Sequence, residues 1–156
     1  MKSSIAVLVL VFSAYTYATK VKDCEGGRSY HENKNITLSY CEKLPCKLKK
    51  GTVAHIEINF SPEKNLEEPT NSIYANILGI PFPFVGVDGT SICGKVFDQE
   101  SGDGVACPLP SGRNLVYRDE FPILQIYPRL SNLEIYWAIK EDEDIISCFQ
   151  VPAKIY

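Results

Sequence analysis

The amino-acid sequence predicts an all-β protein, an immunoglobulin-like β-sandwich of two antiparallel sheets. Several segments alternate apolar and polar residues with a period of two, which is typical of half-buried strands. Turn residues separate these segments, and no stretch shows helical periodicity longer than one turn. About seven or eight short strands at this spacing favour two packed sheets. The sequence shows no repeat, low-complexity tract or linker, so we expect one domain over residues 19–156.

Residues 1–18 have the features of a secretory signal peptide. Lys2 gives a positive start, an apolar run extends from Ile5 to Phe12, and small residues precede a cleavage point after Ala18. The apolar run is too short to span a bilayer. We therefore expect a soluble, secreted protein of roughly 138 residues, the usual size of one domain. Its destination is extracellular or, with a suitably modified glycan, lysosomal.

The first part of the exported chain contains one short predicted strand. Residues 36–41 form it, because Ile36, Leu38 and Tyr40 alternate with polar residues up to Cys41. Proline, lysine and glycine residues then indicate a hairpin-like connection over residues 44–51.

The next two strands are predicted over residues 54–60 and 72–78. The first has a strong alternation that puts His55 on the solvent side, where we interpret it as a solvated residue rather than a ligand or a base. The second is less regular and apolar on both faces. Between them, the polar residues 61–71 read as a loop.

The segment from Gly79 to Gly86 is apolar at every position between its two glycines. Pro81 and Pro83 exclude a helix and a central strand, because proline removes a backbone donor. The remaining structure is a stiff edge strand with Phe82 and Phe84 on the same side. Two interpretations stay open: the prolines guard an edge whose phenylalanines fill the core, or the rings form the entrance to an apolar ligand cavity.

The second half begins with a long loop and a second edge. Residues 91–112 are rich in glycine and acidic side chains, which predicts a loop. Leu115 and Tyr117 then lead to an aromatic and proline-rich edge at residues 121–123 and 127–128.

The clearest alternation in the chain predicts a strand over residues 133–139. The acidic residues 141–144 follow it and are interpreted as a solvated hairpin tip rather than a cation site. The last strand is expected over residues 145–155.

Six cysteines follow the signal segment, and an even number in an exported chain predicts three disulfides. These residues are Cys24, Cys41, Cys46, Cys93, Cys107 and Cys148. The residues alone leave the pairing open, although Cys41 and Cys46 flank a short turn, and a bond between Cys93 and Cys107 would hold the long loop between them. No C-x2-C pair is present, so a metal site is not expected.

Composition and motifs argue against catalysis and nucleic-acid binding. The net charge is −3, and lysine and arginine are scattered among acidic residues, so no nucleic-acid partner is expected. The sequence lacks the G-x-S-x-G elbow of a serine nucleophile. Gly102-Asp103-Gly104 lacks the strand-to-helix context of a phosphate-binding loop. We expect no catalytic residues, no cofactor and no enzyme activity, and we expect a monomer.

Two N-glycosylation sequons begin at Asn35 and Asn59. Asn59 lies on the outward face of its predicted strand, which makes it the better of the two sites, although Pro62 directly after the sequon reduces its use.

Taken together, the motifs resemble one family. They are Asp23-Cys24, Cys41-Glu-Lys-Leu-Pro-Cys46, Lys50-Gly51, Gly79-Ile-Pro-Phe-Pro-Phe84, Asp88-Gly89, Cys107-Pro108-Leu109, Tyr127-Pro128, Trp137 and Cys148-Phe-Gln-Val-Pro152. Their order resembles the Niemann-Pick type C2 sterol carriers and, more broadly, the MD-2-related lipid-recognition (ML) domain family, which includes mite group 2 allergens and secreted arthropod carriers. The resemblance covers essentially the whole exported chain.

The resemblance implies a sandwich whose sheets are splayed around an internal apolar cavity that holds a lipid. It also implies the disulfides Cys24 with Cys148, Cys41 with Cys46, and Cys93 with Cys107. The ligand-contacting residues that it implies are Phe82, Phe84, Ile123, Tyr127, Pro128, Leu38, Ile56, Ile58, Trp137 and Phe149.

The implied function is reversible carriage of a sterol, a fatty acid or an apolar semiochemical, exchanged with a donor or acceptor membrane. The alternative is a recognition module that presents a bound lipid to a protein receptor. Two departures from the sterol carriers bear on the ligand: the gap between Cys93 and Cys107 is longer, and Phe82 is bulkier than the usual aliphatic residue. Both favour a flexible acyl chain over a rigid sterol.

Overall fold

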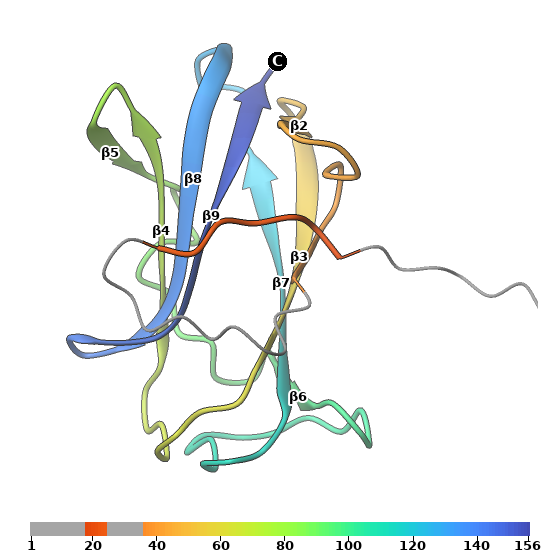
Figure 1. Ribbon diagram of the computed structural model, residues 1–156, viewed down its shortest axis with the longest axis vertical. Coiled ribbons are helices and arrows are strands. Elements are labelled where there is room, and N and C mark those ends of the chain that lie inside the picture. The colour runs from red at the N-terminus through yellow and green to blue at the C-terminus, as the bar shows by residue number, and fades with distance from the viewer. Residues whose placement is uncertain (1–17, 25–35) are drawn as a thin grey trace, which may run out of the picture.

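The computed structural model describes residues 18–24 and 36–156, which form a sandwich of two sheets (Figure 1). Most of the predicted signal segment and the sequon residue Asn35 lie outside these ranges. The strands are β1 (Ile36–Leu38), β2 (Cys46–Leu48), β3 (Thr52–Phe60), β4 (Thr70–Ile77), β5 (Ile80–Pro83), β6 (Val96–Asp98), β7 (Leu115–Ile123), β8 (Leu130–Glu141) and β9 (Asp144–Ile155). The part of the chain that is described contains no helix long and apolar enough to cross a membrane.

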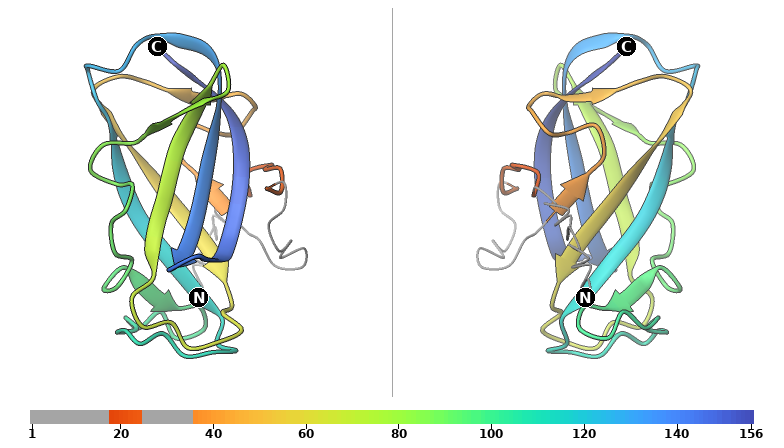
Figure 2. Two further views of the ribbon diagram at one scale, coloured as in Figure 1. Left: turned by 90° about the vertical axis from the view of Figure 1, so that its left-hand side faces the viewer. Right: turned by 90° about the vertical axis from the view of Figure 1, so that its right-hand side faces the viewer.

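The two sheets confirm the predicted fold class. One has the strand order β1-β3-β7-β6 and the other β2-β9-β8-β4-β5, and Figure 2 shows them as two layers facing each other. All strand pairs are antiparallel except β2 with β9, which is parallel. We call the end with β5, residues 124–129 and the C-terminus the upper end, as oriented in Figure 1, and the end with β6 the lower end.

Long, regularly alternating strands form the centre of each layer. In one layer, β3 pairs with β7 from Thr52 opposite Ile123 to Phe60 opposite Leu115. Its even-numbered residues from 54 to 60 are buried, while His55 is exposed as predicted. In the other layer, β8 pairs with β9 and buries the inward residues of the predicted strand 133–139. Because both inner faces are apolar, they pack into one core.

The segment after β4 is an edge strand, as the prolines predict. Strand β5 pairs only with β4, at the end of the five-stranded sheet. The turn before it places Leu78 at φ 53° and Gly79 at φ 84°, and the Asn76 side chain accepts a hydrogen bond from the Gly79 N–H at 2.9 Å. Pro81 and Pro83 remove two donors from the outer edge, which discourages pairing with another chain.

Three short elements differ from the prediction. Strand β1 ends at Leu38 because Tyr40 adopts φ 62°, and the Tyr40 side chain is 54% exposed instead of packing inward. The expected hairpin-like connection contains β2, which pairs with the distant strand β9. The expected loop 91–112 contains β6, which pairs with β7. Strands of three residues show no measurable period, so their distant partners decide whether they form.

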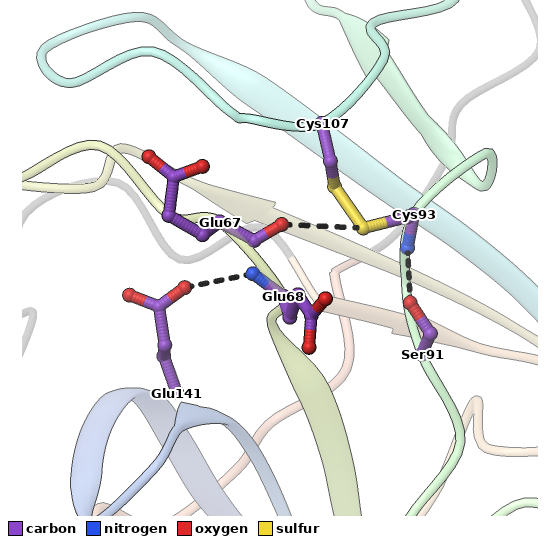
Figure 3. The surroundings of a disulfide bond; sticks show 6 residues. All are labelled: Glu67, Glu68, Ser91, Cys93, Cys107 and Glu141. Carbon is purple, nitrogen blue, oxygen red and sulfur yellow. Dashed lines mark hydrogen bonds between the residues drawn. A yellow bond between two sulfur atoms is a disulfide. The ribbon is translucent and has the colours of Figure 1, made fainter.

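Three disulfides are present, and they are the pairs that the family resemblance implies. Cys24–Cys148 joins the N-terminal segment to β9 across a sequence separation of 124 residues. Cys41–Cys46 closes the turn before β2. Cys93–Cys107 holds the loop around β6 beside residues 67–68, where the Glu68 N–H donates a 3.0 Å hydrogen bond to Glu141 (Figure 3).

Candidate functional site

A cavity of about 500 Å³ opens at the upper end of the sandwich. Its wall comes from β4, β5, the residues that follow β5, the loop between β7 and β8, and the ends of β8 and β9. The lining residues are Ala75, Ile77, Phe82, Pro83, Phe84, Val85, Tyr127, Pro128, Leu130 and Ile155. Nine of these ten side chains are purely apolar, and the tenth is a tyrosine. Such a wall suits a ligand that is mostly hydrocarbon.

The small side chain of Ala75 helps to leave this space open. Ala75 lies on the inward face of β4, between the larger residues Ile73 and Ile77, and it is opposite Phe82 in the register with β5. An alanine at this position fills too little volume to reach the facing wall. The backbone N–H of Phe84 then bonds to the Ile73 carbonyl at 3.1 Å, which turns the Phe84 ring inward below the opening.

Aromatic rings close the cavity from below. Phe84 is 4% exposed and contacts Tyr127 and Phe121 edge to face, with ring centroids 5.7 and 5.8 Å apart. Phe121 in turn contacts Trp137 at 5.4 Å, and Trp137 stacks on Phe149 at 6.3 Å. The interior directly below Phe84 is therefore filled by the protein's own rings.

One hydrogen bond crosses the mouth of the cavity. The Val85 N–H, just after β5, donates to the hydroxyl oxygen of Tyr127 in the loop between β7 and β8, at 3.1 Å. This bond links the edge of the five-stranded sheet to the segment that connects the two sheets, and it fixes the direction of the phenol.

Large exposed apolar side chains occur on the two segments that carry part of the cavity wall, residues 78–85 and the loop between β7 and β8. We call this set the rim: Leu78 is 99% exposed, Ile126 80%, Ile80 58%, Val85 58% and Phe82 49%. Phe82 and Val85 also line the cavity, so rim and cavity wall are continuous. Contiguous exposed apolar residues of this kind mark surfaces that bind a ligand, a membrane or another protein.

The structure separates the implied ligand-contacting residues into two groups. Phe82, Phe84, Tyr127 and Pro128 line the cavity. The other six are at most 5% exposed, lie in the packed core and do not reach the cavity wall: Leu38, Ile56, Ile58, Ile123, Trp137 and Phe149. For that group, contact with a ligand stays a prediction that requires the core to open.

Sequence reasoning did not assign six wall residues to the site. They are Ala75, Ile77, Pro83, Val85, Leu130 and Ile155. Pro83 and Val85 belong to the apolar segment 79–86 and could have been included on that signal. Leu130 and Ile155 lie at the ends of two strands, and only their pairing opposite each other brings them to the cavity.

At the lower end, a buried polar network joins the two sheets. Asn71 on β4 accepts a hydrogen bond from Trp137 Nε1 at 3.1 Å and donates one to the Tyr117 hydroxyl on β7 at 2.6 Å. The Tyr117 hydroxyl donates to Asp119, which is paired with Lys95 at 2.8 Å. Burial, with Asp119 as a second cause, raises the pKa of Tyr117, so its hydroxyl stays protonated and keeps donating.

A second hollow, of about 900 Å³, lies beside β1 and is lined by residues 18–20 and 37–44. Its wall carries the charged side chains of Lys20, Glu42 and Lys43, which makes it a poorer place for an apolar ligand. Across the residues that are described, no group of three or more His, Cys, Asp or Glu side chains could hold a metal ion.

Comparisons with known proteins agree with this architecture. A family model described as ML domain matches residues 18–155. The chain is 30% identical over 111 residues to the ecdysteroid-regulated 16 kDa protein of Manduca sexta, covering 71% of this chain and 70% of that protein. It is 24% identical to the NPC intracellular cholesterol transporter 2 of Bos taurus, covering 97% of this chain and 96% of that protein. The crystal structure of a Niemann-Pick type C2 protein from the Japanese carpenter ant superposes with a TM-score of 0.68 at 25% identity, covering 88% of this chain and 99% of that one.

Proposed function

The chain belongs to the ML domain family, and from this premise we propose that it is a secreted carrier that binds one apolar lipid reversibly in the upper cavity. The observation that carries the proposal is the cavity itself, an opening of about 500 Å³ whose wall is apolar except for one phenol. Its volume lies within the range of roughly 300 to 1,000 Å³ that is typical of pockets for a single small ligand. The bovine relative is named as a cholesterol transporter, which supports a lipid as the ligand class.

Desolvation supplies the affinity in this proposal. Burying one methylene group contributes about 0.8 kcal/mol, so an acyl chain of ordinary length gains on the order of 10 kcal/mol before association is considered. Association itself costs roughly 4 to 15 kcal/mol. With an association cost at the lower end of that range, about 6 kcal/mol remains, which corresponds to a dissociation constant of roughly tens of micromolar. Such an affinity keeps a lipid in solution and still allows its release. The step needs no covalent chemistry and no cofactor.

The shape of the cavity supports a flexible acyl chain as the preferred ligand. The rings of Phe84, Phe121 and Trp137 occupy the interior below the cavity, so a rigid sterol would require this aromatic cluster to move. A flexible chain can follow the wall without that movement.

The rim supports exchange with a donor or acceptor membrane. Leu78 and Ile126 are largely exposed and touch water in the free protein, so contact with a bilayer removes apolar surface from water. In this proposal the rim brings the mouth against the membrane, and the lipid moves between two apolar environments.

Two features support export of the carrier. Thr19, the residue after the predicted cleavage point, donates its N–H to the Ile36 carbonyl at 2.7 Å, and its hydroxyl accepts the Leu38 N–H at 3.1 Å. These two hydrogen bonds join the first residue of the predicted exported chain to β1. Asn59 lies on the outer face of β3 and is partly exposed, which suits an attached glycan.

The experiment compares Phe82→Asp with wild type in a titration with a fluorescent fatty acid and a fluorescent sterol. Phe82 lines the cavity but is half-exposed, so the protein should still fold. The carboxylate introduced at position 82 would lie on the apolar wall. We therefore expect the affinity for both fluorescent ligands to fall at least about tenfold, equivalent to about 1.4 kcal/mol. Phe84→Asp should weaken binding strongly as well, but it also disturbs the core.

The matched control is Val53→Asp, because Val53 is 42% exposed on β3 of the other sheet and does not line the cavity. Its affinity should equal that of wild type. Wild-type protein without saturable binding, or Phe82→Asp with unchanged affinity, would contradict the carrier proposal.

The second candidate function is a recognition module whose loaded surface is read by a protein receptor. It is favoured by the continuity of rim and wall, since Phe82 and Val85 would touch both the ligand and the partner. Transfer of a lipid between vesicles without any further protein supports the carrier. Capture of a receptor only in the presence of lipid supports the recognition module.

A further inference from the structure

The phenol of Tyr127 is the single polar side-chain group on the wall of the upper cavity. A lone polar group on an apolar wall is the kind of feature that fixes the orientation of a ligand. Tyr127 is partly exposed at the mouth, whereas Phe84, whose ring closes the cavity from below, is buried. The polar group therefore lies at the open end of the cavity and not at its closed end.

The hydroxyl proton of Tyr127 is available to a ligand. The hydroxyl oxygen accepts the Val85 N–H, and a phenol can donate its own proton at the same time. Within residues 18–24 and 36–156, the structure gives that proton no protein acceptor. The bond from Val85 also holds the phenol in place, so the donor is fixed in position before a ligand arrives.

We propose that Tyr127 donates a hydrogen bond to an oxygen at the end of the bound lipid and so selects amphipathic lipids over plain hydrocarbons of equal length. The inference rests on the proposed carrier function and adds the chemistry of the ligand: a long apolar chain with a hydroxyl, carbonyl or carboxylate oxygen at one end. The chain lies toward Phe84, and the oxygen lies at the mouth beside Tyr127. A typical hydrogen bond corresponds to roughly twofold to tenfold in affinity, and one to a charged acceptor to more.

The experiment uses Tyr127→Phe, which keeps the ring and its contact with Phe84 and removes the hydroxyl. Dodecane, 1-dodecanol and dodecanoic acid each displace the fluorescent probe N-phenyl-1-naphthylamine from the full exported chain, and the inhibition constants are compared. In Tyr127→Phe we expect the affinity for 1-dodecanol to fall roughly twofold to tenfold and that for dodecanoic acid to fall further, with dodecane unchanged.

Tyr127→Phe also removes the acceptor of the Val85 N–H, which could loosen the mouth. The ratio of the affinities for 1-dodecanol and dodecane separates this effect from the loss of a hydrogen bond to the ligand. A mouth that is merely loosened weakens all three ligands equally and leaves the ratio of 1-dodecanol to dodecane as in wild type. The matched control is Tyr74→Phe, since Tyr74 points to the outer face of β4 and stacks on Tyr136. It should change none of the three affinities.

An unchanged ratio in Tyr127→Phe, with all three ligands still bound by wild type, would overturn this inference and leave the carrier function standing. Failure of wild type to bind any of the three would contradict both.

Discussion

The two ends of the sandwich differ in the interactions that connect the two sheets. At the lower end, the Asn71 and Tyr117 side chains bridge the sheets, and the Cys93–Cys107 disulfide holds the loop around β6. At the upper end, within the part of the chain that the structure describes, one side-chain hydrogen bond, from the Val85 N–H to the Tyr127 hydroxyl, spans the mouth of an apolar cavity. The comparison teaches that a sandwich can keep one end open when polar side-chain links between its two sheets hold the other end together.

A packed apolar core between the two ends explains why both are compatible with one fold. The rings of Phe121, Trp137 and Phe149 fill the middle of the molecule, so the core does not depend on the cavity being filled. The upper end is therefore free to bind and release a guest, and changes at the two ends should have different consequences.

Removing the lower disulfide should give the largest effect. In the chain-entropy model, a loop of about 15 residues contributes about 3 kcal/mol, and Cys93 and Cys107 are 14 residues apart. We expect the double variant Cys93→Ala and Cys107→Ala to lower the free energy of unfolding by about 3 kcal/mol in urea titrations. Its affinity for a fluorescent fatty acid should stay within about twofold, because the distant sites act independently. If the double variant lost its affinity for the fatty acid but kept its stability, this view of the two ends would be wrong.

Filling the cavity should give the opposite phenotype. Ala75→Leu adds three carbon atoms to the wall, and we expect the affinity for a fluorescent fatty acid to fall about tenfold, equivalent to about 1.4 kcal/mol. The stability should change by less than about 1 kcal/mol, because the added atoms enter open space. The control Ala138→Leu enters a packed site beneath the Cys24–Cys148 disulfide and should destabilise by about 1 to 3 kcal/mol without weakening binding. Equal affinity in Ala75→Leu and wild type would place the ligand elsewhere.

The smallest expected effect is on how the stability of the folded protein depends on pH, through a carboxylate at the lower end. Hydrogen bonds from the Ser101 N–H and from the Arg113 side chain lower the pKa of Asp98 from 3.8 to about 2. Because the folded-state pKa is depressed, the ionised carboxylate stabilises the fold above about pH 4, and this contribution is lost as the pH falls through about 2. The urea midpoint of wild type should exceed that of Asp98→Asn most at pH 6, and the difference should vanish near pH 2.

A difference between wild type and Asp98→Asn that stays constant from pH 6 to pH 2 would show that the carboxylate charge does not stabilise the loop. Ligand affinity at pH 6 should be equal in the two proteins, since Asp98 lies at the lower end.

Local pattern was enough for the long strands and for the edge. The alternation within β3 and β8 predicted their inner faces because each segment, 54–60 and 133–139, repeats the same preference over about seven residues. The prolines of β5 excluded every position except an edge. It was not enough for β2 and β6, where three residues form a strand only because β9 and β7 offer them partners.

The sequence by itself determined the sandwich and its even set of six cysteines, and its family resemblance named Phe82, Phe84 and Tyr127 as ligand-contacting residues. Only the tertiary structure decided where the empty space lies. Volume depends on which side chains face each other across the sheets, and residues such as Ala75 and Ile155 acquire a role in the site only through partners far away in the chain. For the same reason, the buried position of Trp137 could be predicted from its strand, whereas its exclusion from the cavity wall could not.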